Sequence, residues 1–147
     1  MRVIVQRSKH SYVSVDDKKI GEIPKGLVVL VGFTENDSEK EIDYIVKKVL
    51  NLRIFDDENG VMNKSILDVK GEILSISQFT LYANPYEGNR PSYISAMKGE
   101  EAKVLYELFN KKLSDFIHVE TGMFGADMLV SIENDGPITI SIDSNRK

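Results

Sequence analysis

The chain has 147 residues, no cysteine, 19 Lys and Arg residues against 23 Asp and Glu residues, and a formal net charge of −4. Its length fits one domain, residues 1–147, with a hydrophobic core large enough to hold the fold without disulfides or structural metals. Without cysteine there is no thiolate nucleophile and no Cys-ligated zinc site. The negative charge argues against tight, unspecific binding of duplex nucleic acid such as DNA, although one end of an RNA could still make a local contact.

The first 15 residues, MRVIVQRSKHSYVSV, alternate polar and apolar side chains and lack the apolar stretch of a signal peptide. The longest apolar run, residues 27–31, is far too short to span a membrane. The absence of cysteine fits a reducing compartment. We therefore expect a cytoplasmic protein with no membrane partner.

The first quarter of the chain predicts β structure. The candidate strands are residues 3–6, 12–15, 19–22 and 26–32. The last of these is short, rich in Val and Leu, and bounded by glycine, which is typical of a strand buried on both faces.

A helix is expected after Ser38. Ser38 and Glu41 have the spacing of a capping box, in which each side chain binds a backbone amide of the other residue. Apolar residues then recur at helical spacing and form one stripe: Ile42, Ile45, Val46, Val49 and Leu50.

The rest of the chain predicts more strands and a second helix. Asn59-Gly60 indicates a hairpin turn, and residues 72–83 read as one long strand. The second helix should cover residues 100–116 with these side chains inward: Leu105, Leu108, Phe109, Leu113 and Phe116. Strands at 128–133 and 138–142 should be joined by a turn at 134–137. The fold class is therefore α+β, a single, mostly β domain with two main helices.

The usual catalytic motifs are missing from the sequence. With His10 and His118 as its two histidines, one chain cannot build a metal site from several imidazoles. Neither a phosphate-binding glycine loop nor a nucleophile elbow occurs, so we expect no metal and no cofactor.

Polar residues inside the 72–83 segment are unusual for a buried strand, and they fit either a solvated edge strand or a site. Thr80 is a possible nucleophile, but neither histidine is near it in sequence to act as its base. Gly136-Pro137 fits an ordinary turn, and since only ~5 to 6% of X-Pro bonds are cis, the sequence alone indicates a trans bond.

Several blocks of the sequence together resemble the D-aminoacyl-tRNA deacylase family, in the same order and close to the same spacing. They are SQFTLYA at 77–83, GNRPS at 88–92, ETGMFGADM at 120–128, NDGPIT at 134–139, MRVIVQR at 1–7, NLRIF at 51–55 and MN at 62–63. The resemblance spans nearly the whole chain.

The resemblance implies a barrel-like α+β homodimer that hydrolyses the ester between a D-amino acid, or mischarged glycine, and the 3′-terminal adenosine of tRNA. The residues implied as catalytic are Ser77, Gln78, Phe79 and Thr80. Those implied in substrate binding are Leu81, which lines the pocket, Phe124, Gly125 and Ala126, which border the adenosine, and Met128. Gly136 and Pro137 would form a cis dipeptide that reaches into the partner subunit's pocket, with its orientation fixed by Arg7.

The implied role of Gly136-Pro137 is physically reasonable. A hydrophobic pocket separates side chains that differ by one methylene by only ~1 to 3 kcal/mol, so side-chain contacts select poorly across many amino acids. A rigid wall beside Cα rejects the L configuration whatever the side chain is. Glycine has no Cβ and would pass such a wall.

Two mechanisms are open for ester cleavage. In the first, Thr80 is a covalent nucleophile. In the second, Thr80 is structural, backbone amides near Phe79 and Thr80 hold the developing oxyanion, and the 2′-hydroxyl of the RNA positions water. We favour the second, because no base accompanies Thr80 and an aminoacyl ester is already reactive.

The chain also departs from the family. Residues 84–87, NPYE, stand where the family often has basic residues. RNA binding is therefore expected to depend on a few local cations: Arg7, Arg90, Arg146 or Lys147.

Two alternative functions stay open. One is a non-catalytic module that binds a single-stranded RNA 3′ end by stacking on Tyr82, Tyr86 and Tyr93. The other is a metal-independent esterase for small molecules.

Overall fold

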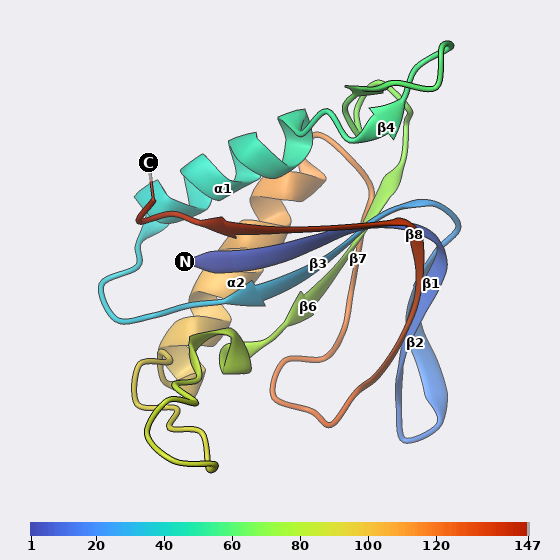
Figure 1. Cartoon of the computed structure of the whole chain (residues 1–147). Helices are drawn as coiled ribbons and strands as arrows, with labels where there is room; N and C mark the ends of the chain where they lie inside the picture. The colour runs from blue at the N-terminus through green and yellow to red at the C-terminus, as the bar shows by residue number, and fades with distance from the viewer. Residues whose placement is uncertain (147) are drawn as a thin grey trace.

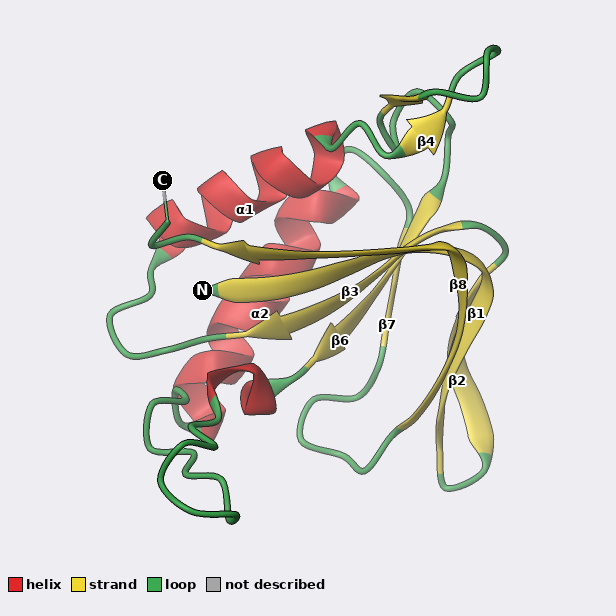
Figure 2. Cartoon of the chain, viewed as in Figure 1, coloured by secondary structure: helices red, strands yellow, loops and turns green. Residues whose placement is uncertain are grey.

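The computed structural model describes residues 1–146, which form a curled six-stranded sheet covered on one side by two α-helices, and a separate two-stranded sheet (Figure 1, Figure 2). In chain order the elements are β1 (Arg2–Val15), β2 (Lys18–Ile23), β3 (Gly26–Gly32), α1 (Glu39–Asn51), β4 (Phe55–Asp56), β5 (Met62–Lys64), β6 (Glu72–Ser77), the 3₁₀ helix η1 (Phe79–Tyr82), α2 (Gly99–Ser114), β7 (Val119–Thr121) and β8 (Leu129–Asp143). The α+β class expected from the sequence is confirmed.

The long strand β1 organises the sheet. Its first half pairs with β3 and its second half with β2, while β8 runs antiparallel to it along the opposite edge. The main path continues from β3 to β6 and β7. The sheet curls until β2 approaches β7, so that a Cβ added to Gly21 would lie 2.7 Å from the carbonyl oxygen of Thr121. The sheet is therefore nearly barrel-like.

The segment β3–α1–β6 is a crossover that makes β3 and β6 parallel. Parallel neighbours need such a connection, and their strands are buried on both faces. All but Leu30 of β3 is buried, as its sequence predicts. The capping box of Ser38 and Glu41 is present, and the expected apolar stripe of α1 is buried.

The core lies in two parts, one on each face of the sheet. The larger part lies between the sheet and the helices and includes Phe109 and Leu113 of α2. The smaller part fills the inside of the curl and consists of Val13, Ile23, Val28, Leu74 and Ile76. Among the described residues, no helix is long and apolar enough to cross a membrane.

Several expected boundaries are wrong. The strands expected at 3–6 and 12–15 are one strand, and those at 128–133 and 138–142 are also one, because β1 and β8 pair along almost their whole lengths with shifts in register. The strand expected at 72–83 ends at Ser77 and is followed by η1. Phe116 lies beyond α2 and is 65% exposed instead of inward.

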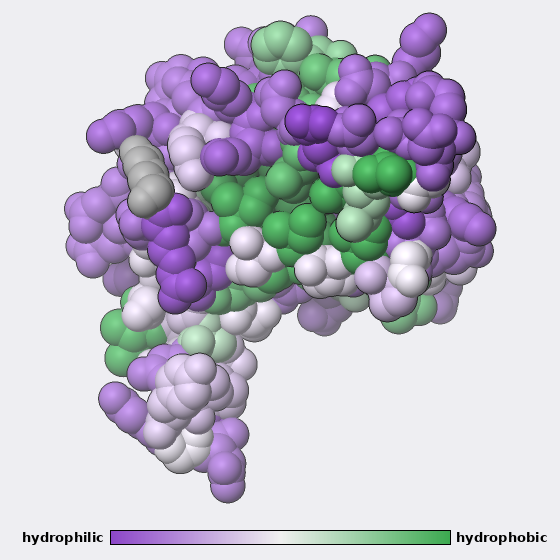
Figure 3. All heavy atoms as spheres, turned by 45° about the horizontal axis from the view of Figure 1, so that its top comes forward, coloured by the Kyte–Doolittle hydropathy of each residue, from purple (hydrophilic) through white to green (hydrophobic). Residues whose placement is uncertain are grey.

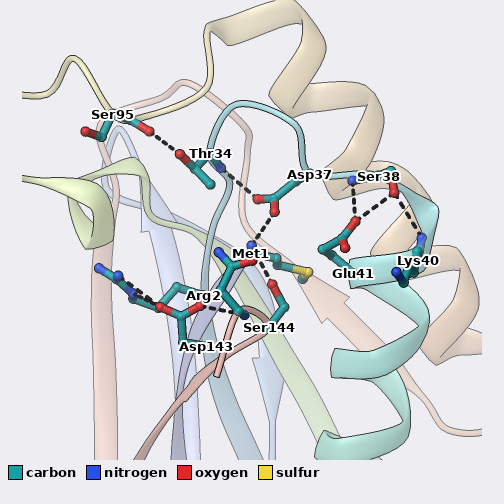
Figure 4. A network of polar contacts seen from close by, with 11 residues as sticks. Met1, Arg2, Thr34, Asp37, Ser38, Lys40, Glu41, Ser95, Asp143 and Ser144 are labelled. Carbon is teal, nitrogen blue, oxygen red and sulfur yellow. Dashed lines mark hydrogen bonds and ion pairs between the residues drawn. The ribbon is translucent and has the colours of Figure 1, made fainter. Parts of the chain in front are cut away.

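The start of β1 is tied to three other segments by a polar network (Figure 4). The Met1 amino group binds the carboxylate of Asp37 and the hydroxyl of Ser144. Asp37 also accepts a hydrogen bond from the Thr34 amide, and the Thr34 hydroxyl donates to the carbonyl oxygen of Ser95. This network joins the loop after β3 to the segment that precedes α2.

Candidate functional site

A cavity of about 600 Å³ lies where the parallel strands β3 and β6 end. The carboxyl ends of parallel strands are a common place for ligand sites, since the chain leaves the sheet there in loops. Four segments contribute to the walls: 31–33 at the end of β3, 76–79 at the end of β6, 93–102 around the start of α2, and 124–130 before and within β8. The wall is mainly apolar, with polar groups supplied by Ser77, Gln78, Lys98 and Asp127.

The 3₁₀ helix η1 begins beside this cavity, which its first residue, Phe79, lines. Its first intrahelical bond runs from the Leu81 amide to the Gln78 carbonyl oxygen at 3.3 Å. The amides of Phe79 and Thr80 come before that bond, so they lack an intrahelical partner. The Phe79 ring is 56% exposed and meets the ring of Tyr93 edge-on, with centroids 5.2 Å apart.

The position of η1 is set by contacts from distant parts of the chain. The Gln78 amide donates to the Val31 carbonyl oxygen at 2.7 Å, and Arg2 donates to the Leu81 carbonyl oxygen at 2.7 Å. A Cβ added to Gly32 would lie 2.9 Å from the Gln78 carbonyl oxygen, so η1 packs directly on the backbone of β3.

Thr80 lies on the exposed side of η1 and does not line the cavity. Its hydroxyl accepts a hydrogen bond of 2.5 Å from the Gln78 side-chain amide. His10 instead contacts Glu22, and His118 contacts Glu120. Within residues 1–146, therefore, neither histidine and no carboxylate is hydrogen-bonded to Thr80 to take its proton.

The segment 124–128 forms another wall of the cavity. Phe124 packs on the ring of Tyr106 with centroids 5.8 Å apart, and the Tyr106 hydroxyl donates to the Ser75 carbonyl oxygen at 2.7 Å. Burial raises the pKa of Tyr106, so this hydroxyl keeps its proton and remains a donor. Gly125, Ala126 and Met128 also line the cavity.

Gly136 and Pro137 lie elsewhere, at an exposed bend of β8. Their peptide bond is cis, and Gly136 has φ +120°, a conformation that favours glycine. In Figure 1 this bend lies near β4, whereas η1 lies at the opposite end of the sheet. Neither residue lines the cavity of its own chain.

Arg7 holds this bend from inside. Its guanidinium donates to the carbonyl oxygens of Ile54 at 2.8 Å and Asp135 at 3.3 Å, and pairs with the carboxylates of Asp56 and Asp135, each at 3.3 Å. The Asn134 amide group donates to the carbonyl oxygens of Arg7 and Ile138. Arg7 is buried, so it serves this bend and is not one of the surface cations available to RNA.

The structure thus brings most of the expected residues together and leaves others apart. Ser77, Gln78, Phe79, Phe124, Gly125, Ala126 and Met128 line the cavity, whereas Arg7, Thr80, Leu81, Gly136 and Pro137 do not. Sequence reasoning missed Lys98 and Gly99 at the start of α2, and Val31 at the end of β3. Val31 could have been found from the sequence, because it lies near the carboxyl end of a strand expected to be buried on both faces, and ligand sites are common at the carboxyl ends of parallel strands.

Other expected features fall outside the site. Tyr82 is buried under Arg2, whose guanidinium lies 4.5 Å from the ring centroid, so this ring cannot stack on RNA. Lys147 lies outside the described residues. Among residues 1–146 there is no group of three or more His, Asp or Glu side chains placed to hold a metal ion.

Comparisons with known proteins agree on one family. The family model described as D-Tyr-tRNA(Tyr) deacylase matches residues 4–143. A D-aminoacyl-tRNA deacylase of Clostridium tetani is 60% identical over 147 residues, covering 99% of each chain. One of Bacteroides fragilis is 56% identical, covering 100% of this chain and 99% of its own.

Comparison with solved structures shows that the fold is also shared. The chain is similar to a structure described as c-Myc DNA Unwinding Element Binding Protein, with TM-score 0.93, 40% identity, and coverage of 97% of this chain and 98% of the other. It also resembles a probable eukaryotic D-amino acid tRNA deacylase with TM-score 0.80 at 18% identity, over 96% and 97% of the two chains. The chain belongs to the D-aminoacyl-tRNA deacylase family, a family of hydrolases that cleave the ester bond of aminoacyl-tRNA.

Proposed function

We propose that this enzyme removes D-amino acids, and glycine, from the 3′-terminal adenosine of tRNA, and that Gly136-Pro137 of a second copy of the chain rejects L-amino acids. The observation that carries the proposal is the bend at 134–138, in which Gly136 and Pro137 are exposed while Arg7 and Asn134 fix the bend from inside. A rigid and exposed backbone element can contact a ligand and exclude an L-amino acid without moving aside.

Selection by main-chain atoms explains how one site can accept many side chains. A wall beside Cα acts on the position of Cβ, which differs between D and L forms of every chiral amino acid. Discrimination by side-chain fit would be worth only ~1 to 3 kcal/mol per methylene. Because glycine has no Cβ, the same wall accepts glycine.

A second copy is needed for this role, since Gly136 and Pro137 do not line the cavity of their own chain. Two-fold symmetry would let each copy supply its bend to the other. The edge strand β8 carries Ile138, Ile140 and Ile142, all only partly buried. An apolar area lies in the middle of the face turned forward in Figure 3, as expected for a surface that another chain covers.

For ester cleavage we favour backbone catalysis over a covalent Thr80. The amides of Phe79 and Thr80 are available beside the cavity, and oxyanion stabilisation by preorganised amides is a strong catalytic effect. The Thr80 hydroxyl meets the Gln78 amide group rather than a base. In this mechanism the 2′-hydroxyl of the terminal adenosine positions the attacking water.

The proposal is tested by release of labelled amino acid from matched D-tyrosyl-tRNA and L-tyrosyl-tRNA with catalytic amounts of protein. We expect many turnovers on the D substrate and slow release from the L substrate. Equal rates on both would contradict chiral selection. Binding without turnover would instead favour an RNA-binding module, and equal efficiency on simple amino esters would favour a general esterase.

A further inference from the structure

Exposed apolar side chains gather on one loop beside the cavity. The loop covers residues 84–95, here called the projecting loop, and it extends away from the body of the molecule (Figure 1). Ile94 is 93% exposed, Tyr86 is 91% exposed and Tyr93 is 45% exposed. Among residues 1–146, no ring contact and no side-chain hydrogen bond is found for Tyr86.

The loop is held in shape despite its exposure. Asn84 and Ser92 exchange two backbone hydrogen bonds, at 2.8 and 3.0 Å, and the Asn84 side chain accepts from the Tyr86 amide at 3.1 Å. Farther along, the Thr34 hydroxyl binds the carbonyl oxygen of Ser95 at 2.6 Å. A loop whose backbone is already ordered loses less conformational entropy when it binds a ligand.

The aromatic rings follow a path out of the cavity. Tyr93 lines the cavity and contacts Phe79, while Tyr86 lies on the far side of the Asn84–Ser92 bridge. Tyr93 is one residue from Ser92 and Tyr86 is two residues from Asn84, so the two tyrosines flank this bridge.

Charge favours stacking over phosphate contacts on this loop. Its charged residues are Glu87 and Arg90, which cancel. Phosphate neutralisation needs an excess of cations, whereas single strands also bind by stacking successive bases on aromatic side chains. An exposed tyrosine next to a net neutral surface fits an unpaired base.

From this placement we infer that the projecting loop binds the unpaired nucleotides next to the terminal adenosine, by stacking them on Tyr93 and Tyr86. The inference rests on the proposed function, because it assumes that the adenosine end of an RNA occupies the cavity. It adds a subsite for the RNA strand, separate from the selection of the amino acid.

The test compares three substrates of increasing length: D-tyrosyl-adenosine, the D-tyrosyl ester of a trinucleotide ending in adenosine, and D-tyrosyl-tRNA. Tyr86→Ala should raise KM about tenfold on the trinucleotide and on tRNA, and leave D-tyrosyl-adenosine unaffected. Tyr86→Phe keeps the ring and should behave as the wild type. Phe116→Ala, which removes an exposed ring that follows α2 and does not line the cavity, is the control and should change none of the three.

A second measurement separates stacking from charge. Because stacking releases few counterions, Tyr86→Ala should leave the slope of log KM against log salt unchanged, while it shifts the whole line. An unchanged KM on the longer substrates would overturn the inference, as would a KM that also rises for D-tyrosyl-adenosine. A shift in sedimentation on Tyr86→Ala would overturn it too, because the loop would then be a contact between copies.

Failure of the proposed function gives a different result. If the wild type releases no amino acid from any of the three substrates, the proposed function itself is wrong. If the wild type cleaves all three with one KM, the enzyme keeps its function and the subsite alone is refuted.

Discussion

Arg2 donates a hydrogen bond of 2.7 Å to the carbonyl oxygen of Leu81, and this bond ties the first strand to the helix η1, whose first residue, Phe79, lines the cavity. The same guanidinium pairs with Asp143 at 3.0 Å and covers the ring of Tyr82. Arg2 therefore joins the start of β1, the end of β8 and the site, although these lie about 80 and 140 residues apart in sequence.

Removing the guanidinium should loosen η1. We expect Arg2→Met to lower the free energy of unfolding by about 1 to 2 kcal/mol and to lower kcat about tenfold, with KM little changed. Arg53→Met is the matched control, because Arg53 donates to the Asn63 carbonyl oxygen on an exposed hairpin. Urea unfolding and steady-state kinetics measure both effects, and a wild-type kcat in Arg2→Met would show that η1 does not need this anchor.

The pairing of Arg2 with Asp143 should also affect how the free energy of unfolding changes at acidic pH. Burial by itself would raise the pKa of Asp143, but hydrogen bonds from the Asn145 amide and from Arg2 outweigh it and lower this pKa below its ordinary value. Because the folded pKa is the lower one, the stabilisation is complete above the unfolded pKa of ~3.9 and is lost as pH falls through the folded value.

Asp143→Asn should therefore destabilise the protein at neutral pH and reduce its loss of stability on acidification. The measurement is the free energy of unfolding from pH 6 down to the lowest pH at which the wild type still folds. If the free energy of unfolding falls equally steeply with pH in the variant and the wild type below pH 4, Asp143 does not contribute to the acid sensitivity.

The close contact between β3 and η1 predicts a strong effect of one methyl group. In Gly32→Ala the new Cβ would lie 2.9 Å from the Gln78 carbonyl oxygen and 3.0 Å from the Leu81 Cβ, so η1 must shift. We expect a loss of about 1 to 3 kcal/mol of stability and at least a tenfold fall in kcat. For stability, Gly99→Ala is the control, because nothing lies within 4 Å of its added Cβ; equal effects of the two substitutions would refute the role of this contact.

Thr80 separates the two mechanisms of ester cleavage. With backbone catalysis, Thr80→Ala should keep kcat within a few-fold, whereas a substrate whose terminal adenosine lacks the 2′-hydroxyl should react about 100-fold more slowly. Thr80→Ser retains the hydroxyl and serves as the control. An inactive Thr80→Ala together with normal cleavage of the deoxy substrate would make Thr80 the nucleophile.

Local signals explain why parts of the fold could be predicted from the sequence. Ser38 and Glu41 fix the start of α1 through bonds within four residues, and the run at 26–32 is apolar on both faces because both faces are covered. In both cases the residues that define the element lie inside it or next to it.

The end of β6 was not predictable in this way. The apolar and polar pattern of 72–83 continues past Ser77, but the backbone turns there because Val31 accepts a hydrogen bond from the Gln78 amide and Arg2 holds Leu81. These partners lie far away in sequence, so no local pattern contains them. The expected strand was wrong for this reason.

The residues of the site also fall into two groups, those that the sequence predicted and those that tertiary packing alone brings to the cavity. Its motif residues at 77–79 and 124–128 were found through the family resemblance, whereas Lys98 and Gly99 enter the cavity only because α2 packs across the sheet. The environment of Arg7 is likewise built by Ile54, Asp56 and Asp135, which tertiary structure alone brings together.

Chiral selection by Gly136-Pro137 is tested most directly by the ratio of kcat/KM for D-tyrosyl-tRNA to that for L-tyrosyl-tRNA, measured in the wild type and in Pro137→Ala. The proline ring fixes one backbone dihedral at the exposed bend, so its removal should relax the wall beside Cα. We predict that the ratio falls at least tenfold, through faster cleavage of the L substrate, while the exposed-turn control Pro24→Ala keeps the wild-type ratio. A Pro137→Ala variant with the wild-type ratio would contradict the account.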